Sequence, residues 1–113
     1  MHKKRRILLL AADHGLESSL AELLRVEGLE VVPAPSGSTA TPQVDVVIAA
    51  CDSWPAPWTL PMLRNHFRSV PCLLLSSSPV SGPYAATGFQ RGYFLTLPAN
   101  GRRIVERVKA LLP

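Results

Sequence analysis

The sequence predicts one α/β domain, with a parallel sheet covered by helices on both faces. The chain has 113 residues, enough for a single hydrophobic core over residues 1–113. Hydrophobic residues make up 47% and charged residues 18% of it, as in packed domains rather than disordered chains. Short, continuous apolar runs alternate with helix-like segments. This alternation is typical of parallel strands that are buried on both faces.

The first half contains three predicted strands and one helix. Ile7–Ala12 is a continuous apolar run, Leu29–Val32 is a short second strand, and Val44–Cys51 is a third. Between the first two, Gly15–Glu27 predicts a helix that stops at Gly28 and carries one apolar stripe of Leu16, Leu20, Leu23 and Leu24.

The second half repeats the pattern with two strands and two helices. Leu60–Phe67 predicts a short helix, and Pro71–Leu75 and Tyr93–Leu97 predict strands. Asn100 can cap a final helix over 101–112, whose apolar stripe is Ile104, Val105, Val108, Leu111 and Leu112. The connections 33–43 and 76–92 are rich in Pro, Gly and Ser, so helices there should be short, irregular or absent.

The net charge of +4 comes from a short leader. The chain has 12 basic and 8 acidic side chains, so without Lys3, Lys4, Arg5 and Arg6 it has eight of each. We expect this leader to keep the start of the first strand soluble; an arm for nucleic acid or membrane is the alternative. If the protein binds nucleic acid at all, we expect it to do so only through a separate domain.

Cys51 and Cys72 both lie in apolar runs, where a free cysteine acts as a small hydrophobe. Their spacing matches no zinc pattern, so we expect no metal and a reduced, cytoplasmic protein. No run approaches the length needed to span a bilayer. Since the chain stops where the last helix stops, we expect the N-terminal domain of a longer protein.

The ordered elements resemble the response-regulator receiver family over Arg6–Leu112. The segments that carry the resemblance are RILLLAADH, GLEVVPAPSG, VDVVIAA, VPCLLLSSS and GFQRGYFLTLP. The resemblance implies a flavodoxin-like three-layer α/β/α sandwich with a five-stranded parallel sheet in the order 2-1-3-4-5. The Pro-, Ser- and Thr-rich segment 33–43 departs from the family, so we expect the second helix to be shortened or absent. The resemblance also implies a cis Leu97–Pro98 bond, since X-Pro bonds are the ones in which the cis form costs little.

Receivers take a phosphoryl group onto an aspartate, and here the matching pocket has lost its charges. The metal-binding acidic pair maps onto Ala11 and Ala12, the phosphoacceptor onto Ala50, and the lysine onto Leu97. Only the hydroxyl position is kept, as Ser76. A methyl group neither binds Mg²⁺ nor accepts a phosphoryl group, so the alignment predicts a degenerate phosphorylation pocket with no catalytic residue, metal or cofactor.

A shifted register leaves alternatives open. Asp52 could accept the phosphoryl group with Asp13 as a metal ligand, or Cys51 could stand at the acceptor position. Trp54 and Trp58 lie in a proline-stiffened loop and either cover the end of the sheet or anchor a partner. Further candidates for a contact surface are Phe94, Arg103 and Arg107.

We therefore expect a pseudo-receiver without enzymatic activity, acting by protein–protein contact in bacterial signal transduction or transcription control. The partner would be another protein, an attached output domain or a second copy in a homodimer. The alternatives are the shifted receiver that uses Asp52 and a sensor of small ligands such as nucleotide second messengers. A ligand of that kind would bind at the carboxyl ends of the strands.

Overall fold

A computed structural model describes residues 4–32, 43–50, 59–77, 92–96 and 100–112. Its five strands form one parallel sheet in the order β2-β1-β3-β4-β5, as predicted. The elements in chain order are β1 (Arg6–Leu10), α1 (His14–Val26), β2 (Glu30–Val32), β3 (Val46–Ala50), α2 (Leu60–His66), β4 (Cys72–Ser76), β5 (Gly92–Thr96) and α4 (Gly101–Leu111).

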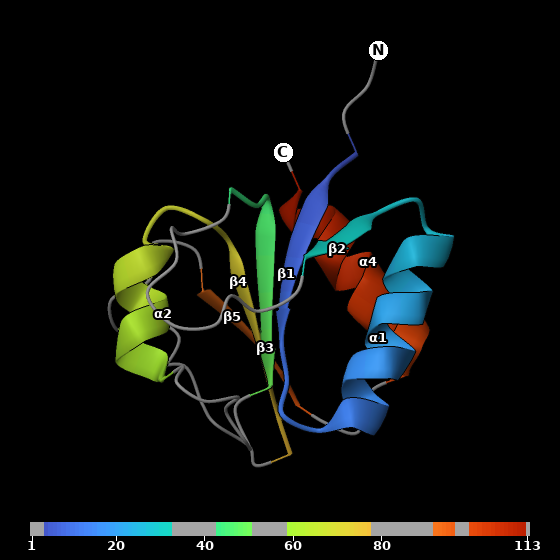
Figure 1. The fold of residues 1–113 in the computed structure, drawn as a ribbon, viewed down its shortest axis with the longest axis horizontal. Coiled ribbons are helices and arrows are strands. Elements are labelled where there is room, and N and C mark those ends of the chain that lie inside the picture. The colour runs from blue at the N-terminus through green and yellow to red at the C-terminus, as the bar shows by residue number, and fades with distance from the viewer. Residues whose placement is uncertain (1–3, 33–42, 51–58, 78–91, 97–99, 113) are drawn as a thin grey trace.

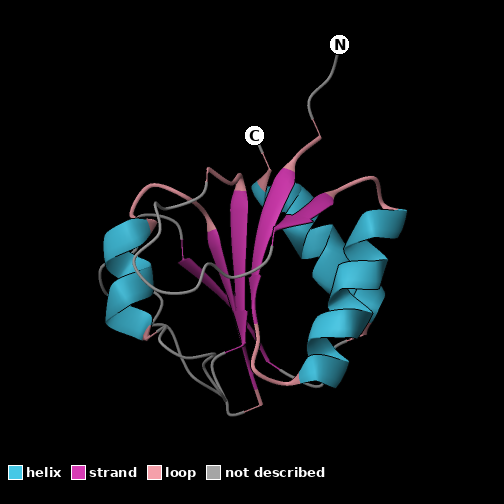
Figure 2. Ribbon diagram, viewed as in Figure 1, coloured by secondary structure: helices cyan, strands magenta, loops and turns pink. Residues whose placement is uncertain are grey.

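Helices cover both faces of the sheet, and the sheet divides the core into two halves (Figures 1 and 2). Side chains alternate along each strand. Ile7 and Leu9 therefore face α1 and α4, whereas Leu8 and Leu10 face α2. The central strands β3 and β4 are buried along their whole length. This burial on both faces explains why they are continuous apolar runs.

Local signals determine where the helices begin and end. Asp13, Thr59 and Asn100 stand at the N-caps of α1, α2 and α4, and each side chain accepts a hydrogen bond from the backbone N–H three residues later. Gly28, just beyond α1, has a φ of 82°, a left-handed conformation that favours glycine. The predicted cap at Asn100 and the stop at Gly28 are confirmed.

The structure corrects several details of the predicted elements, and the third strand, for example, begins at Val46 and not at Val44. β1 ends at Leu10, so Ala11 and Ala12 follow the strand instead of belonging to it. Leu23 does not point into the core with Leu20 and Leu24, because it lies on the flank of α1 that meets α4 and keeps 37% of its surface exposed.

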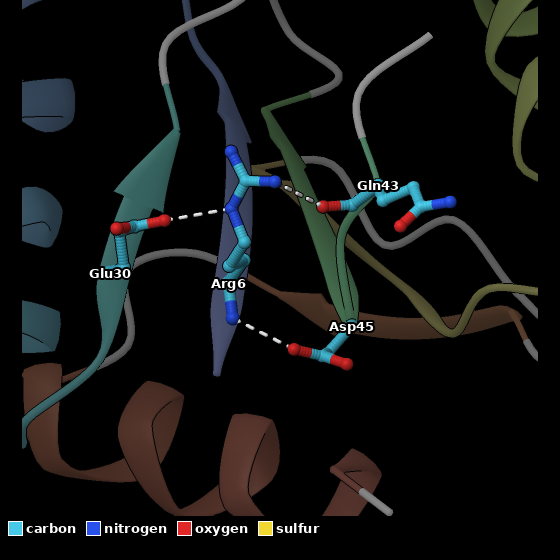
Figure 3. Close-up of polar contacts among 4 residues, drawn as sticks. All are labelled: Arg6, Glu30, Gln43 and Asp45. Atoms are coloured by element: carbon cyan, nitrogen blue, oxygen red, sulfur yellow. Dashed lines mark hydrogen bonds and ion pairs between the residues drawn. The ribbon is translucent and has the colours of Figure 1, made fainter. Parts of the chain in front are cut away.

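Arg6 was assigned to the charged leader, but it is the first residue of β1 and is anchored on both sides (Figure 3). Its Nε donates to Glu30 Oε2 at 2.7 Å, and its Nη1 donates to the carbonyl oxygen of Gln43 at 3.0 Å. Its backbone N–H donates to Asp45 Oδ2 at 2.8 Å. Arg6 thus joins β2 to the segment before β3 at the amino edge of the sheet. The weak second helix predicted over 33–43 lies outside the described residues except for Gln43.

Candidate functional site

The carboxyl ends of parallel strands meet at one edge of the sheet, and three of the predicted pocket residues lie there. Ala11 directly follows β1, while Ala50 and Ser76 are the last residues of β3 and β4. Leu10 pairs with Ala49, which places Ala11 and Ala50 at matching levels on neighbouring strands. The fold therefore brings together residues from three separate parts of the sequence.

These positions are closed to solvent and largely apolar. Ala11 is 4% exposed, Ala50 is 6% exposed and Ser76 is 4% exposed. Ala12, the next residue along the chain, is partly exposed. Two methyl groups therefore lie at the carboxyl ends of the neighbouring strands β1 and β3. Within the described ranges, no group of three or more His, Cys, Asp or Glu side chains could hold a metal ion.

Asp13 lies at the same edge, where it caps α1. Its Oδ1 accepts a hydrogen bond from the backbone N–H of Leu16 at 3.0 Å, and its carbonyl oxygen accepts one from Glu17 N at 2.9 Å. Its side chain is exposed, and its negative charge stands at the positive end of the helix dipole. The geometry gives this carboxylate a structural task at the helix start.

The last residue of β5 was overlooked in the sequence. Thr96 pairs with Ser76 and is exposed at the same edge, so a hydroxyl group stands beside the buried serine. The prediction extended this strand to Leu97 because the apolar character of the segment continues past Thr96. Thr96 could have been identified in the sequence as the polar residue directly before Leu97 and Pro98.

Comparison with known proteins defines the fold. No protein-family model and no curated sequence matches the chain, but many solved structures do. The Vibrio cholerae chemotaxis protein CheY4 superposes with a TM-score of 0.76 at 16% identity, over 97% of this chain and 100% of that one. The signal receiver domain of an HD domain-containing protein from Pseudomonas fluorescens has a TM-score of 0.77 at 18% identity, over 96% of this chain and 94% of that one. An orphan response regulator of H. pylori has a TM-score of 0.72 at 18% identity, over 96% of this chain and 97% of that one.

The fold is that of a response-regulator receiver domain. The flavodoxin-like architecture and the strand order 2-1-3-4-5 that the resemblance implied are both confirmed. None of the helices in the described parts of this receiver fold combines the length and apolar character required to cross a bilayer.

Several predicted residues of the receiver fold lie outside the described residues. These are Cys51, Asp52, Trp54, Trp58 and Leu97, and with them the bond between Leu97 and Pro98. Phe94 belongs to β5, but its side chain is not described. The shifted acceptors Asp52 and Cys51 and the tryptophan contact surface therefore remain predictions.

The remaining candidates of the receiver fold belong to α4 and to the start of β4. Arg103 and Arg107 are exposed on α4. Cys72 begins β4 on the α2 face of the sheet and is fully buried, with its Sγ 3.4 Å from the carbonyl oxygen of Val70. Burial raises the pKa of this thiol from 9.0 to about 12. The thiolate is therefore scarce at neutral pH, and Cys72 acts as part of the core.

Proposed function

We propose that this chain is a receiver-type regulatory domain that takes up no phosphoryl group and acts through contact with other proteins in bacterial signalling or transcription control. The observation that carries the proposal is the pair of buried methyl groups, Ala11 and Ala50, at the ends of the neighbouring strands β1 and β3. Phosphoryl transfer would need carboxylates there.

The chemistry of the edge supports this proposal. Mg²⁺ requires oxygen ligands, and an acyl phosphate can form only on a carboxylate. The nearby carboxylate of Asp13 caps α1. Acidic side chains gathered without a metal would repel one another and would resist burial. Alanine at these places lets the edge pack without that cost.

A regulatory domain without phosphoryl chemistry acts by binding. One of the similar structures is the receiver domain of an HD domain-containing protein, and another is an orphan response regulator. These two relatives support a role beside an attached output domain or a separate protein partner, as a regulator rather than an enzyme.

The deciding experiment is phosphoryl labelling. The purified chain is incubated with acetyl phosphate and Mg²⁺, and its intact mass is measured beside that of a receiver domain with a complete acidic pocket. We expect a phosphoryl adduct on the control and none on this chain. A Mg²⁺-dependent adduct would overturn the proposal.

Two variants identify the acceptor if labelling occurs. Loss of the adduct in Asp52→Ala would assign the shifted receiver site, with Asp52 as acceptor. Loss in Cys51→Ala would assign the cysteine. Retention in both would leave the phosphoryl group on a residue outside either register, which also contradicts the proposal.

A further inference from the structure

The outer flank of α1 is hollowed on the side away from α4. Leu23 and Glu27 face α4, through the contact with Gly101 and the ion pair with Lys109. The opposite side of the helix bounds a hollow of about 530 Å³. Its lining consists of Glu17, Ser18, Ala21, Glu22, Arg25 and Val26.

This surface is open, and the charges on it form no ion pair with the residues that the structure describes. Val26 is 79% exposed, more than Leu23 or Tyr93, the other large exposed hydrophobic side chains among the described residues. Glu27 and Glu106 each form an ion pair. Within the described ranges, by contrast, Glu22 and Arg25 form none. The flank thus combines apolar surface with one base, Arg25, and two acids, of which Glu22 is three residues from that base.

The order of these two charges makes the surface complementary to itself. Glu22 and Arg25 are three residues apart, on the same side of the helix. When two such helices run antiparallel about a two-fold axis midway between these residues, the Glu22 of each lies opposite the Arg25 of the other. A two-fold axis brings the same patch of both copies together, so the contact contains two equivalent ion pairs.

From this arrangement we propose that a second copy of the chain docks on this flank, with the two α1 helices antiparallel and Val26 covered against the other copy. A second copy would then be a partner in the proposed contact function, on which this inference rests. The free charges select a second copy over an unrelated apolar helix, because each finds its opposite in the same surface.

The contact is small, and the association should be correspondingly weak. α1 has 13 residues, and the area that one such helix offers is below the roughly 800 Å² per partner of a typical stable interface. We expect a dissociation constant on the order of 0.1 mM.

The test is sedimentation equilibrium on the 113-residue chain from about 10 µM to about 1 mM, a range chosen to bracket that weak constant. The average mass should rise from the 12.3 kDa of one chain towards twice that value. Val26→Lys places a charge in the contact and should weaken association at least tenfold. Ala110→Lys is the matched control, since it adds the same side chain to an exposed position of α4. It should leave association unchanged, and circular dichroism should show both variants folded.

Charge reversal tests the antiparallel register. Glu22→Arg and Arg25→Glu should each abolish self-association, because like charges then meet across the axis. Mixed in equal amounts, these two variants should associate with each other at least as well as the wild type does with itself. Arg107→Glu makes the same charge change on α4 and should have no effect.

Three results would overturn the inference. The first is a monomer at every concentration, and the second is a Val26→Lys chain that still dimerises. The third is a loss of dimers in Arg107→Glu while the Glu22→Arg and Arg25→Glu variants still dimerise. Phosphoryl labelling is independent of these measurements. A chain that takes no label but stays monomeric would contradict the dimer alone, whereas a labelled dimer would contradict the proposed function alone.

Discussion

The carboxylate of Asp13 and the thiol of Cys72 are chemically reactive types of group, but both have structural roles here. Asp13 stands where the chain turns from β1 into α1, and its carboxylate is bonded to the first turn of the helix. Cys72 is fully buried on the α2 face of β4. In each case the surroundings, rather than the residue type, determine the role.

Replacing Asp13 separates a capping role from a metal-binding role. Asp13→Ala removes the acceptor for Leu16 N and should lower the free energy of unfolding by about 1 kcal/mol, whereas Asp13→Asn, a good N-cap, should be nearly neutral. Urea denaturation followed by circular dichroism measures both. Millimolar Mg²⁺ should not change these values. Stabilisation of the wild type by Mg²⁺ that is lost in both variants would show that Asp13 binds metal.

The pKa of Cys72 predicts a loss of stability at high pH. Because its pKa is raised to about 12 in the folded chain, the unfolded chain releases this proton first. Between pH 9 and pH 12 the free energy of unfolding should therefore fall, by up to about 1.4 kcal/mol per pH unit from this group. Below pH 9 the group should have no effect.

The measurement compares urea denaturation of Cys51→Ala with that of Cys51→Ala/Cys72→Ala from pH 8 to pH 11. The difference in slope isolates Cys72 from all other groups of the chain. Equal slopes would contradict the prediction, as would rapid reaction of the native Cys51→Ala chain with a thiol reagent at pH 8.

At the scale of whole elements, the contact between α1 and α4 depends on one small residue. A Cβ atom added at Gly101 would approach Leu23 Cδ1 to 2.3 Å. Glycine in the first turn thus lets the start of α4 lie against the flank of α1. Farther along the helices, Lys109 Nζ and Glu27 Oε2 form an ion pair at 2.5 Å. Both partners are partly exposed, so this pair should add little stability.

A double-mutant cycle tests this packing. Gly101→Ala should leave the free energy of unfolding nearly unchanged, because a rotamer cost of about 0.5–1.5 kcal/mol at Leu23 offsets the better helix propensity of alanine. In a Leu23→Ala background the space is free, and the same substitution should become stabilising. Urea denaturation of the four proteins gives the coupling energy. An equal effect in both backgrounds would show that the two helices are not limited by this contact.

In the molecule as a whole, one sheet separates two halves of the core that share its strands. Leu24 belongs to the half under α1 and α4, and Leu63 to the half under α2. Both are fully buried. Since β1, β3 and β4 contribute side chains to both halves, neither half should persist without the other.

Truncation on either face should therefore weaken the same unfolding transition. Leu24→Ala and Leu63→Ala should each lower the free energy of unfolding by about 2–5 kcal/mol, a large part of the roughly 5–15 kcal/mol typical of a domain. Circular dichroism and tryptophan fluorescence should give coincident urea curves for both variants. Separate transitions in either variant would show that the halves unfold independently.

Much of the candidate site was predictable, because its positions depend on strand order. Once the apolar runs were taken as parallel strands, the residues after β1 and at the end of β3 had to meet at one edge. Ala11 and Ala50 do so. The hollow on α1 was not predictable in the same way. The leucine stripe shows which face of a helix is buried, but not which flank a neighbouring helix leaves open.

The sequence by itself determined the strands, the helices and their caps, because these follow from periodicity and from hydrogen bonds over three or four residues. Only the tertiary structure decided the places of Arg6, Leu23 and Ala11. Arg6 is held by Glu30 and by Gln43, 24 and 37 residues away, and Leu23 meets α4 across an even longer span of the chain. Ala11 is buried beyond the end of its strand by the packing around it. Contacts between residues so far apart leave no periodic trace in the sequence, and they exist only once the sheet has brought its strands together.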